Sequence, residues 1–152
     1  MPRQKPPVIE GQIPDPNDTY DLDDNQRLKS ANLLFDSNLK IADEYDHYPH
    51  CKWAIIEYKS RSLSDAIAQL DWTAKQLVAM SRKVDYAIII ARGIDNPERN
   101  LYTKQGNALI YKPKKSPVTI KTGNNIINVA IYDPFEIDVQ YKTYRGTLWA
   151  FR

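Results

Sequence analysis

The order of apolar and polar residues predicts a strand–helix–strand unit in the middle of the chain. Residues 52–59 are rich in aromatic and β-branched side chains, which is typical of a strand. Residues 84–90 form a near-continuous apolar run, which indicates a strand covered on both faces at the centre of a sheet. Between them, one apolar stripe at helical spacing runs to about residue 82 and consists of Leu63, Ala66, Ile67, Leu70, Ala74, Leu77 and Val78. Because the links are short, the unit predicts a right-handed crossover between parallel strands.

The sequence Ser62-Leu63-Ser64-Asp65 fits a capping box and predicts the start of this helix. Residues 19–36 predict an earlier helix, capped by Asp23 or Asp24, because Leu28, Ala31, Leu34 and Phe35 recur at helical spacing.

Strands dominate the other predicted elements. Residues 39–43 predict a weak strand that forms a hairpin with 52–59 around the turn His47-Tyr48-Pro49-His50. Further strands are expected at 109–111, 118–121 and 126–132, with the turn Thr122-Gly123-Asn124-Asn125 joining the last two. Together, the elements predict an α/β fold with a mixed β-sheet flanked by helices.

The N-terminal residues 1–18 hold five of the ten prolines. Proline excludes helix, and the stretch has little to bury, so it predicts an extended arm that is either disordered or lies along the domain or a partner subunit. Residues 19–152 are expected to form a single α/β domain.

Composition narrows the class of protein. The chain has 152 residues, 42% hydrophobic and 26% charged, as expected for one globular domain. No stretch approaches the roughly 18 apolar residues of a membrane helix, and the N-terminus lacks the apolar core of a signal peptide. The single cysteine, Cys51, forms no internal disulfide, which favours a cytoplasmic protein.

Charge is distributed unevenly. Residues 1–50 hold 5 basic and 10 acidic residues, a balance of −5, whereas residues 51–152 hold 16 and 9, a balance of +7. The basic part predicts a polyanionic partner such as nucleic acid. The alternative is that scattered lysines keep a small domain in solution.

The sequence Glu57-Tyr58-Lys59 at the end of an apolar strand is the strongest chemical signal. Alternation places Glu57 and Lys59 on one face. The predicted hairpin brings Glu57 roughly opposite Ala42 or Asp43, so that Asp43 and Glu57 place two carboxylates around one cation. Mg²⁺ binds through one or two carboxylates plus substrate phosphate. These residues therefore predict metal-assisted phosphodiester hydrolysis. The alternative is that Glu57 and Lys59 form an ion pair at the end of a strand on the sheet edge.

The stretch from Asp43 to Glu57-Tyr58-Lys59-Ser60, followed by a helix and an apolar strand, resembles the PD-(D/E)xK nuclease superfamily, which includes archaeal Holliday-junction resolvases and many restriction endonucleases. The resemblance covers about residues 24–92. It implies a restriction-endonuclease-like fold, Mg²⁺ or Mn²⁺ held by Asp43 and Glu57, and Lys59 assisting the attack of water.

By the same resemblance, Gln69 is the polar residue that the following helix offers to the site, and Asp24 is a candidate for a further acid. Asp46 is an alternative to Asp43 as the first acid. No proline precedes Asp43, and Thr73 occupies the position of a tyrosine in the helicase-associated nucleases. The alternative that the protein is an inactive descendant of this fold therefore stays open.

A second cluster holds His47, His50 and Cys51, with Asp46 beside them. Imidazole and thiolate bind zinc, but a structural zinc site needs four ligands, usually from two clusters. A polar turn explains the segment equally well.

Basic residues predict where nucleic acid is bound. The candidates are Arg61, Arg92, Lys112, Lys114 and Lys115. The alternative is a charged, exposed hairpin. In the tail, Tyr141, Tyr144, Trp149 and Phe151 predict packing on the core, a dimer contact or base stacking.

The function expected from these residues is a metal-dependent nuclease that acts on DNA, most simply as a homodimer. The alternative is a non-catalytic interaction or nucleic-acid-binding module that keeps a nuclease-like fold.

Overall fold

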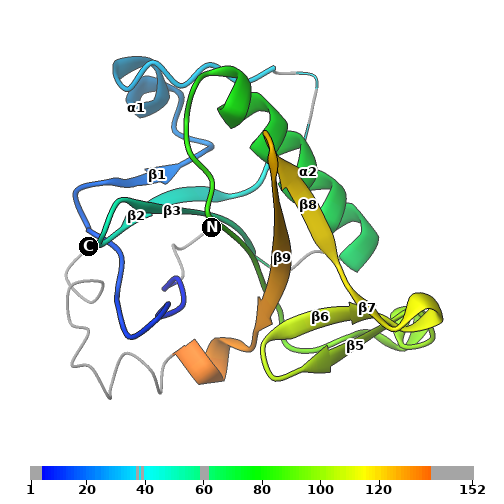
Figure 1. The fold of residues 1–152 in the computed structure, drawn as a ribbon. Helices are drawn as coiled ribbons and strands as arrows, with labels where there is room; N and C mark the ends of the chain where they lie inside the picture. The colour runs from blue at the N-terminus through cyan, green and yellow to red at the C-terminus, as the bar shows by residue number, and fades with distance from the viewer. Residues whose placement is uncertain (1–4, 37, 39, 59–61, 138–152) are drawn as a thin grey trace.

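The computed structural model describes residues 5–36, 38, 40–58 and 62–137, and these form a mixed α/β fold built on one nine-stranded sheet (Figure 1). The helical elements include α1 (Asn25–Ser30), α2 (Leu63–Ala79) and the 3-10 turns η1 (Asn96–Glu98) and η2 (Lys112–Lys114). The strands are β1 (Thr19–Asp21), β2 (Glu44–Tyr48), β3 (Lys52–Tyr58), β4 (Tyr86–Ile90), β5 (Tyr102–Gln105), β6 (Ala108–Tyr111), β7 (Ser116–Pro117), β8 (Thr119–Thr122) and β9 (Asn125–Tyr132).

The strand order is β1-β2-β3-β4-β9-β6-β5, with β7 paired to β6 and β8 paired to β9. β3, β4 and β9 run parallel, and the outer pairs are antiparallel. The carboxyl ends of β3, β4 and β9 therefore meet at one edge of the sheet. This is the edge where open α/β sheets bind ligands.

Each face of the sheet has its own core. On one face α2 packs over a cluster that includes Tyr45, Ile55, Ile89 and Ile131. On the other face the cluster includes Ile56, Ile88 and Tyr132, and the N-terminal segment covers it through Val8 and Ile9. Figure 1 shows α2 on one side of the sheet and the dark-blue N-terminal segment on the other.

The predicted crossover is confirmed. β3 and β4 pair in parallel across α2, and β4 lies at the middle of the strand order. The helix begins where the capping box predicts, since the Ser62 side chain accepts a hydrogen bond from the Asp65 N–H at 3.3 Å. The hairpin of β8 and β9 is also confirmed, and Gly123 in its turn has a positive φ of 68°.

The predicted helix over residues 19–36 is wrong in extent. Residues 19–21 form β1, and α1 ends after Ser30. Asn32 adopts a left-handed φ of 58°, the Leu33 N–H donates to the Leu28 carbonyl at 2.8 Å, and the Asn32 N–H donates to the Lys29 carbonyl at 3.1 Å. These are the two bonds of a Schellman cap, and the buried Leu28 and Leu33 supply its apolar contact.

The predicted strand over residues 39–43 is displaced to β2. The hairpin turns later than expected, because His50 and Cys51 both take positive φ angles, of 67° and 57°. Two such residues suit the twist of a tight β-hairpin, so Tyr48 pairs with Lys52 and the strand starts at Glu44.

The N-terminal stretch is non-helical over its described residues, but the expectation that it has little to bury is wrong. Residues 6–9 are buried, and the Tyr48 hydroxyl donates to the Pro7 carbonyl at 2.7 Å. Within the described residues, no helix is long and apolar enough to cross a membrane.

Candidate functional site

Asp43 and Glu57 lie side by side where β2 and β3 meet the carboxyl edge of the sheet. Asp43 directly precedes β2 and continues its pairing, since its N–H donates to the Ile56 carbonyl at 2.9 Å. Its Oδ2 also accepts from the Tyr58 N–H at 2.7 Å. Glu57 shares a sheet face with Ile55, which belongs to the core under α2. The hairpin therefore brings together the two carboxylates that the sequence predicts, on the helix-covered face.

The Glu57 carboxyl is held in an environment that resists its ionisation. The side chain is only 5% exposed. Burial, followed by the negative charge of Asp43 and a hydrogen bond between the two side chains, raises the pKa of Glu57 to about 9. A protonated Glu57 is thus the donor and Asp43 the acceptor, so the pair shares one proton when no cation is bound.

Asp43 is half-buried, and two opposing effects act on it. Burial raises the pKa of its carboxyl, while the hydrogen bonds from the Tyr58 N–H and from Glu57 lower it. Burial is the larger effect, so the pKa lies above its ordinary value.

Two further acids surround the pair. Asp21 and Asp23 are exposed, and their charges raise the pKa of Asp43 further, with Asp23 also acting on Glu57. They reach the site because β1 pairs with β2 and the Leu22 N–H donates to the Asp43 carbonyl at 2.9 Å. Asp24, the acid suggested by the resemblance, instead caps α1 through the Arg27 N–H at 3.2 Å. Only the pairing of β1 with β2 identifies Asp23, and no local pattern in the sequence could have found it.

The site is suited to a divalent cation. Oε1 of Glu57 is buried and has no hydrogen-bond partner among the described residues. A buried carboxylate oxygen without a partner is costly, and a cation would satisfy it. Hard oxygen donors from two carboxylates, with further acids at the rim, are the ligands that Mg²⁺ and Mn²⁺ prefer.

Helix α2 lines the approach to the pair. Thr73 accepts a hydrogen bond from the Ala42 N–H at 2.7 Å, next to Asp43. Gln69 lies one turn earlier on the same side of α2 and is half-buried. Lys59 and Arg61 follow β3 directly but lie outside the described residues.

Asp46, the alternative first acid, lies on the opposite face of the sheet from Glu57. It pairs with Ala54 in register, is 0% exposed, and its charge acts on the buried Tyr58 hydroxyl. Tyr58 donates a short hydrogen bond to Glu44 on this same face. The structure therefore places Asp43, and not Asp46, beside Glu57.

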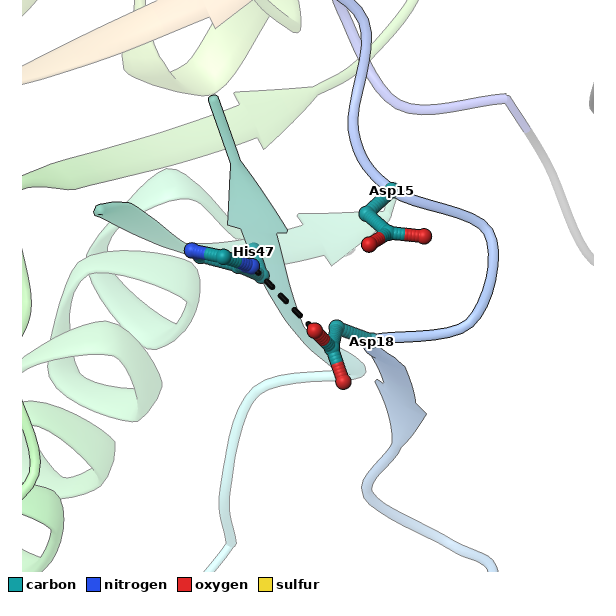
Figure 2. A group of neighbouring side chains, drawn as sticks. All are labelled: Asp15, Asp18 and His47. Carbon is teal, nitrogen blue, oxygen red and sulfur yellow. Dashed lines mark hydrogen bonds and ion pairs between the residues drawn. The ribbon is translucent and has the colours of Figure 1, made fainter. Parts of the chain in front are cut away.

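A separate group of possible metal ligands consists of Asp15, Asp18 and His47, whose ligand atoms lie within 4.8 Å of one another. Figure 2 shows the His47 ring beside Asp18. His47 Nδ1 lies 3.3 Å from Asp18 Oδ2. His47 lies four residues from Asp43 along β2, about 13 Å at roughly 3.3 Å per residue. This triad can hold a metal ion, but it is distinct from the Asp43–Glu57 pair. His50 and Cys51, which the zinc hypothesis includes, are exposed in the hairpin turn and are not part of it.

The basic candidates lie toward the other end of the same sheet edge. Arg92 is exposed just after β4, and Lys112, Lys114 and Lys115 occupy η2 and the residue after it. Lys112 also lines a cavity of about 370 Å³. The tail aromatics Tyr141, Tyr144, Trp149 and Phe151 lie outside the described residues.

Comparison with family models, with curated proteins and with solved structures gave no match.

Proposed function

We propose that the protein is a metal-dependent nuclease that hydrolyses phosphodiester bonds of DNA, with Mg²⁺ or Mn²⁺ held by Asp43 and Glu57. The observation that carries the proposal is the buried Glu57 Oε1, which has no partner among the described residues and lies beside a second carboxylate. Without a cation, the two acids are held together by one shared proton, and Glu57 Oε1 is left without a partner among the described residues. A cation would replace that proton and be coordinated by both carboxylates.

The roles proposed for the residues rest on the described contacts of Asp43 and on the resemblance. Asp43 is oriented by the Tyr58 N–H and presents its carboxylate toward Glu57. The bound cation would polarise the scissile phosphate and an attacking water. By the resemblance to PD-(D/E)xK nucleases, Lys59 assists that water, and Gln69 on α2 is a positioning residue. The restriction-endonuclease-like form of the fold is part of the same proposal.

The test is cleavage of labelled single-stranded, double-stranded and branched DNA in Mg²⁺ or Mn²⁺, with EDTA as the blank. We expect cleavage by the natural sequence and its loss in Glu57→Gln, Asp43→Asn and Lys59→Ala. Isothermal titration with the metal alone separates the roles, since Glu57→Gln should abolish binding at the Asp43–Glu57 pair and Lys59→Ala should retain it.

The matched controls are Asp18→Asn and His47→Gln, which alter the second group of ligands while leaving Asp43 and Glu57 in place. These controls should cleave normally. If they abolish cleavage and Glu57→Gln does not, the metal centre is the Asp15–Asp18–His47 triad and the proposed site is wrong. If the protein cleaves no nucleic acid with either metal, the non-catalytic module replaces the nuclease.

A further inference from the structure

The cavity of about 370 Å³ near Lys112 combines an apolar wall, which includes Ile94, Tyr102 and Ile131, with several basic residues. It opens between the carboxyl ends of β4 and β9, the loop that contains η1, and β5. Arg99, Lys104 and Lys112 line it, and Asp133 is the one acid among its lining residues. The formal charge of the lining is therefore positive. A volume above roughly 300 Å³ is typical of ligand pockets and exceeds what a single ion needs.

Hydrogen bonds fix the basic side chains at the rim of this cavity. Arg99 Nε donates to the Ile94 carbonyl at 3.2 Å, and Lys112 Nζ donates to the Arg99 carbonyl at 2.9 Å. Lys104 is paired with Glu136 at 2.5 Å. Arg99 therefore keeps the two terminal nitrogens of its guanidinium as donors within the described part of the chain. Arg99 and Lys112 are the cations available to an anion.

The register of the sheet places this cavity close to the acid pair and on the same face. Glu57 is paired with Ile89, and Ile89 with Ile131, which lines the cavity. Two strand spacings of roughly 4.8 Å separate Glu57 from Ile131, so the distance between them is about 10 Å. Along the axis of a duplex, each strand rises roughly 3.4 Å per nucleotide, so this distance corresponds to about three nucleotides along the axis.

We propose that this cavity binds a phosphate group of a nucleic-acid strand a few nucleotides from the cleaved bond, through Arg99 and Lys112. The inference rests on the proposed function, because it assigns the substrate of that same site. The planar guanidinium of Arg99 matches two phosphate oxygens, and Lys112 adds a point charge. The acidic pair alone repels a phosphodiester, and a neighbouring cationic pocket offsets that repulsion. The group that the cavity binds is a phosphate, which is either the terminal phosphate of a strand or an internal phosphodiester.

The test measures binding without metal or cleavage, so it is independent of the nuclease assay. Fluorescence anisotropy in EDTA follows a labelled single strand that carries a 5′-phosphate, and the same strand with a 5′-hydroxyl. We compare Arg99→Ala/Lys112→Ala with Lys75→Ala/Lys121→Ala, which removes two exposed charges outside the cavity. Thermal melting of each variant checks that it is folded.

We expect the cavity variant to bind at least tenfold more weakly and the control to change less than threefold. The slope of log K against log salt should fall by about 0.7 for each phosphate of the single strand that the variant no longer neutralises. Weakening confined to the 5′-phosphorylated strand identifies a terminal phosphate, and equal weakening for both strands identifies an internal one. A cavity variant that binds with the natural affinity and salt slope, or a control that weakens as much, overturns the proposal. If Glu57→Gln abolishes cleavage but keeps this binding, both proposals stand. If the natural protein binds DNA through the cavity but never cleaves it, the proposed nuclease function is wrong and the phosphate-binding proposal stands.

Discussion

Replacing Glu57 by glutamine should stabilise the protein while abolishing its response to metal. In the folded state the pKa of Glu57 is about 9, against an ordinary value of 4.5. Because this pKa is raised, the folded state binds the proton more tightly than the unfolded state. The contribution of Glu57 to stability is therefore complete below about pH 4.5 and is lost as the pH rises through about 9.

The magnitude follows from the linkage between protonation and folding. At pH 7.5, three pH units above the ordinary pKa, the loss is about 4 kcal/mol at about 1.36 kcal/mol per unit. This is an upper limit, because relaxation and water near the site raise the effective dielectric. Glutamine is neutral and can donate to Asp43 as the protonated acid does. The substitution removes the pH-dependent loss of stability, so the free energy of unfolding of the metal-free variant should rise by about 1 to 4 kcal/mol at pH 7.5. A gain of 1 kcal/mol corresponds to about 2–4 °C in Tm for a chain of this size.

The assay is thermal unfolding in EDTA and in Mg²⁺, at several pH values between 5 and 9. We expect the two proteins to converge at pH 5 and the variant to be more stable at pH 7.5 in EDTA. Mg²⁺ at about 100 times its Kd should stabilise the natural protein by about 2.7 kcal/mol and leave the variant unchanged. A variant that is less stable at pH 7.5 in EDTA, or equal stabilisation of both proteins by Mg²⁺, would refute the reasoning.

Three other predictions concern individual side chains. Thr73→Val leaves the buried Ala42 N–H without its acceptor and should lower the free energy of unfolding by about 1–3 kcal/mol in urea denaturation. At the start of α2, the Glu98 carboxylate accepts a hydrogen bond from the Leu63 N–H at 2.7 Å. Glu98→Ala should therefore lower the free energy of unfolding by about 1 kcal/mol in the same assay. Asp71→Ala, which removes a surface ion pair with Lys75, should lower it by less. His47→Gln should weaken any Mn²⁺ or Zn²⁺ binding at the Asp15–Asp18–His47 triad without altering the Mg²⁺ response that depends on Glu57; a loss of both responses would contradict the separation of the two sites.

Local patterns predict the central part of the fold well. The apolar runs of β3 and β4 and the capped stripe of α2 are strong signals, because each depends on burial that repeats at one spacing. The hairpin of β8 and β9 follows from its glycine turn. The pairing of Asp43 with Glu57 was also predictable, since the apolar strand and the position of the turn limit the register.

The other features depend on interactions between distant segments. The end of α1 depends on Asn32 taking a left-handed conformation, which helical spacing alone does not reveal. The burial of Val8 and Ile9 depends on an open sheet face that only the assembled strands create. The cavity takes Arg99 from a loop, Lys104 from β5 and Lys112 from η2, and no short pattern in the sequence joins these three residues.

The alternation of side chains along the extended chain decides whether Asp43 or Asp46 lies beside Glu57. The two acids are three positions apart, and neighbouring positions in an extended chain point to opposite faces. Only one of them can therefore lie on the face of Glu57, and the register that pairs Asp46 with Ala54 selects Asp43. Asp46 and Glu44 then lie with the Tyr58 hydroxyl on the face that the N-terminal segment covers. Asp43 and Glu57 lie on the face of α2, at the carboxyl edge of the parallel strands, where the basic cavity also opens. The same alternation thus separates Asp46 and Glu44, which are buried beneath the N-terminal segment, from Asp43 and Glu57, which lie at the carboxyl edge of the parallel strands.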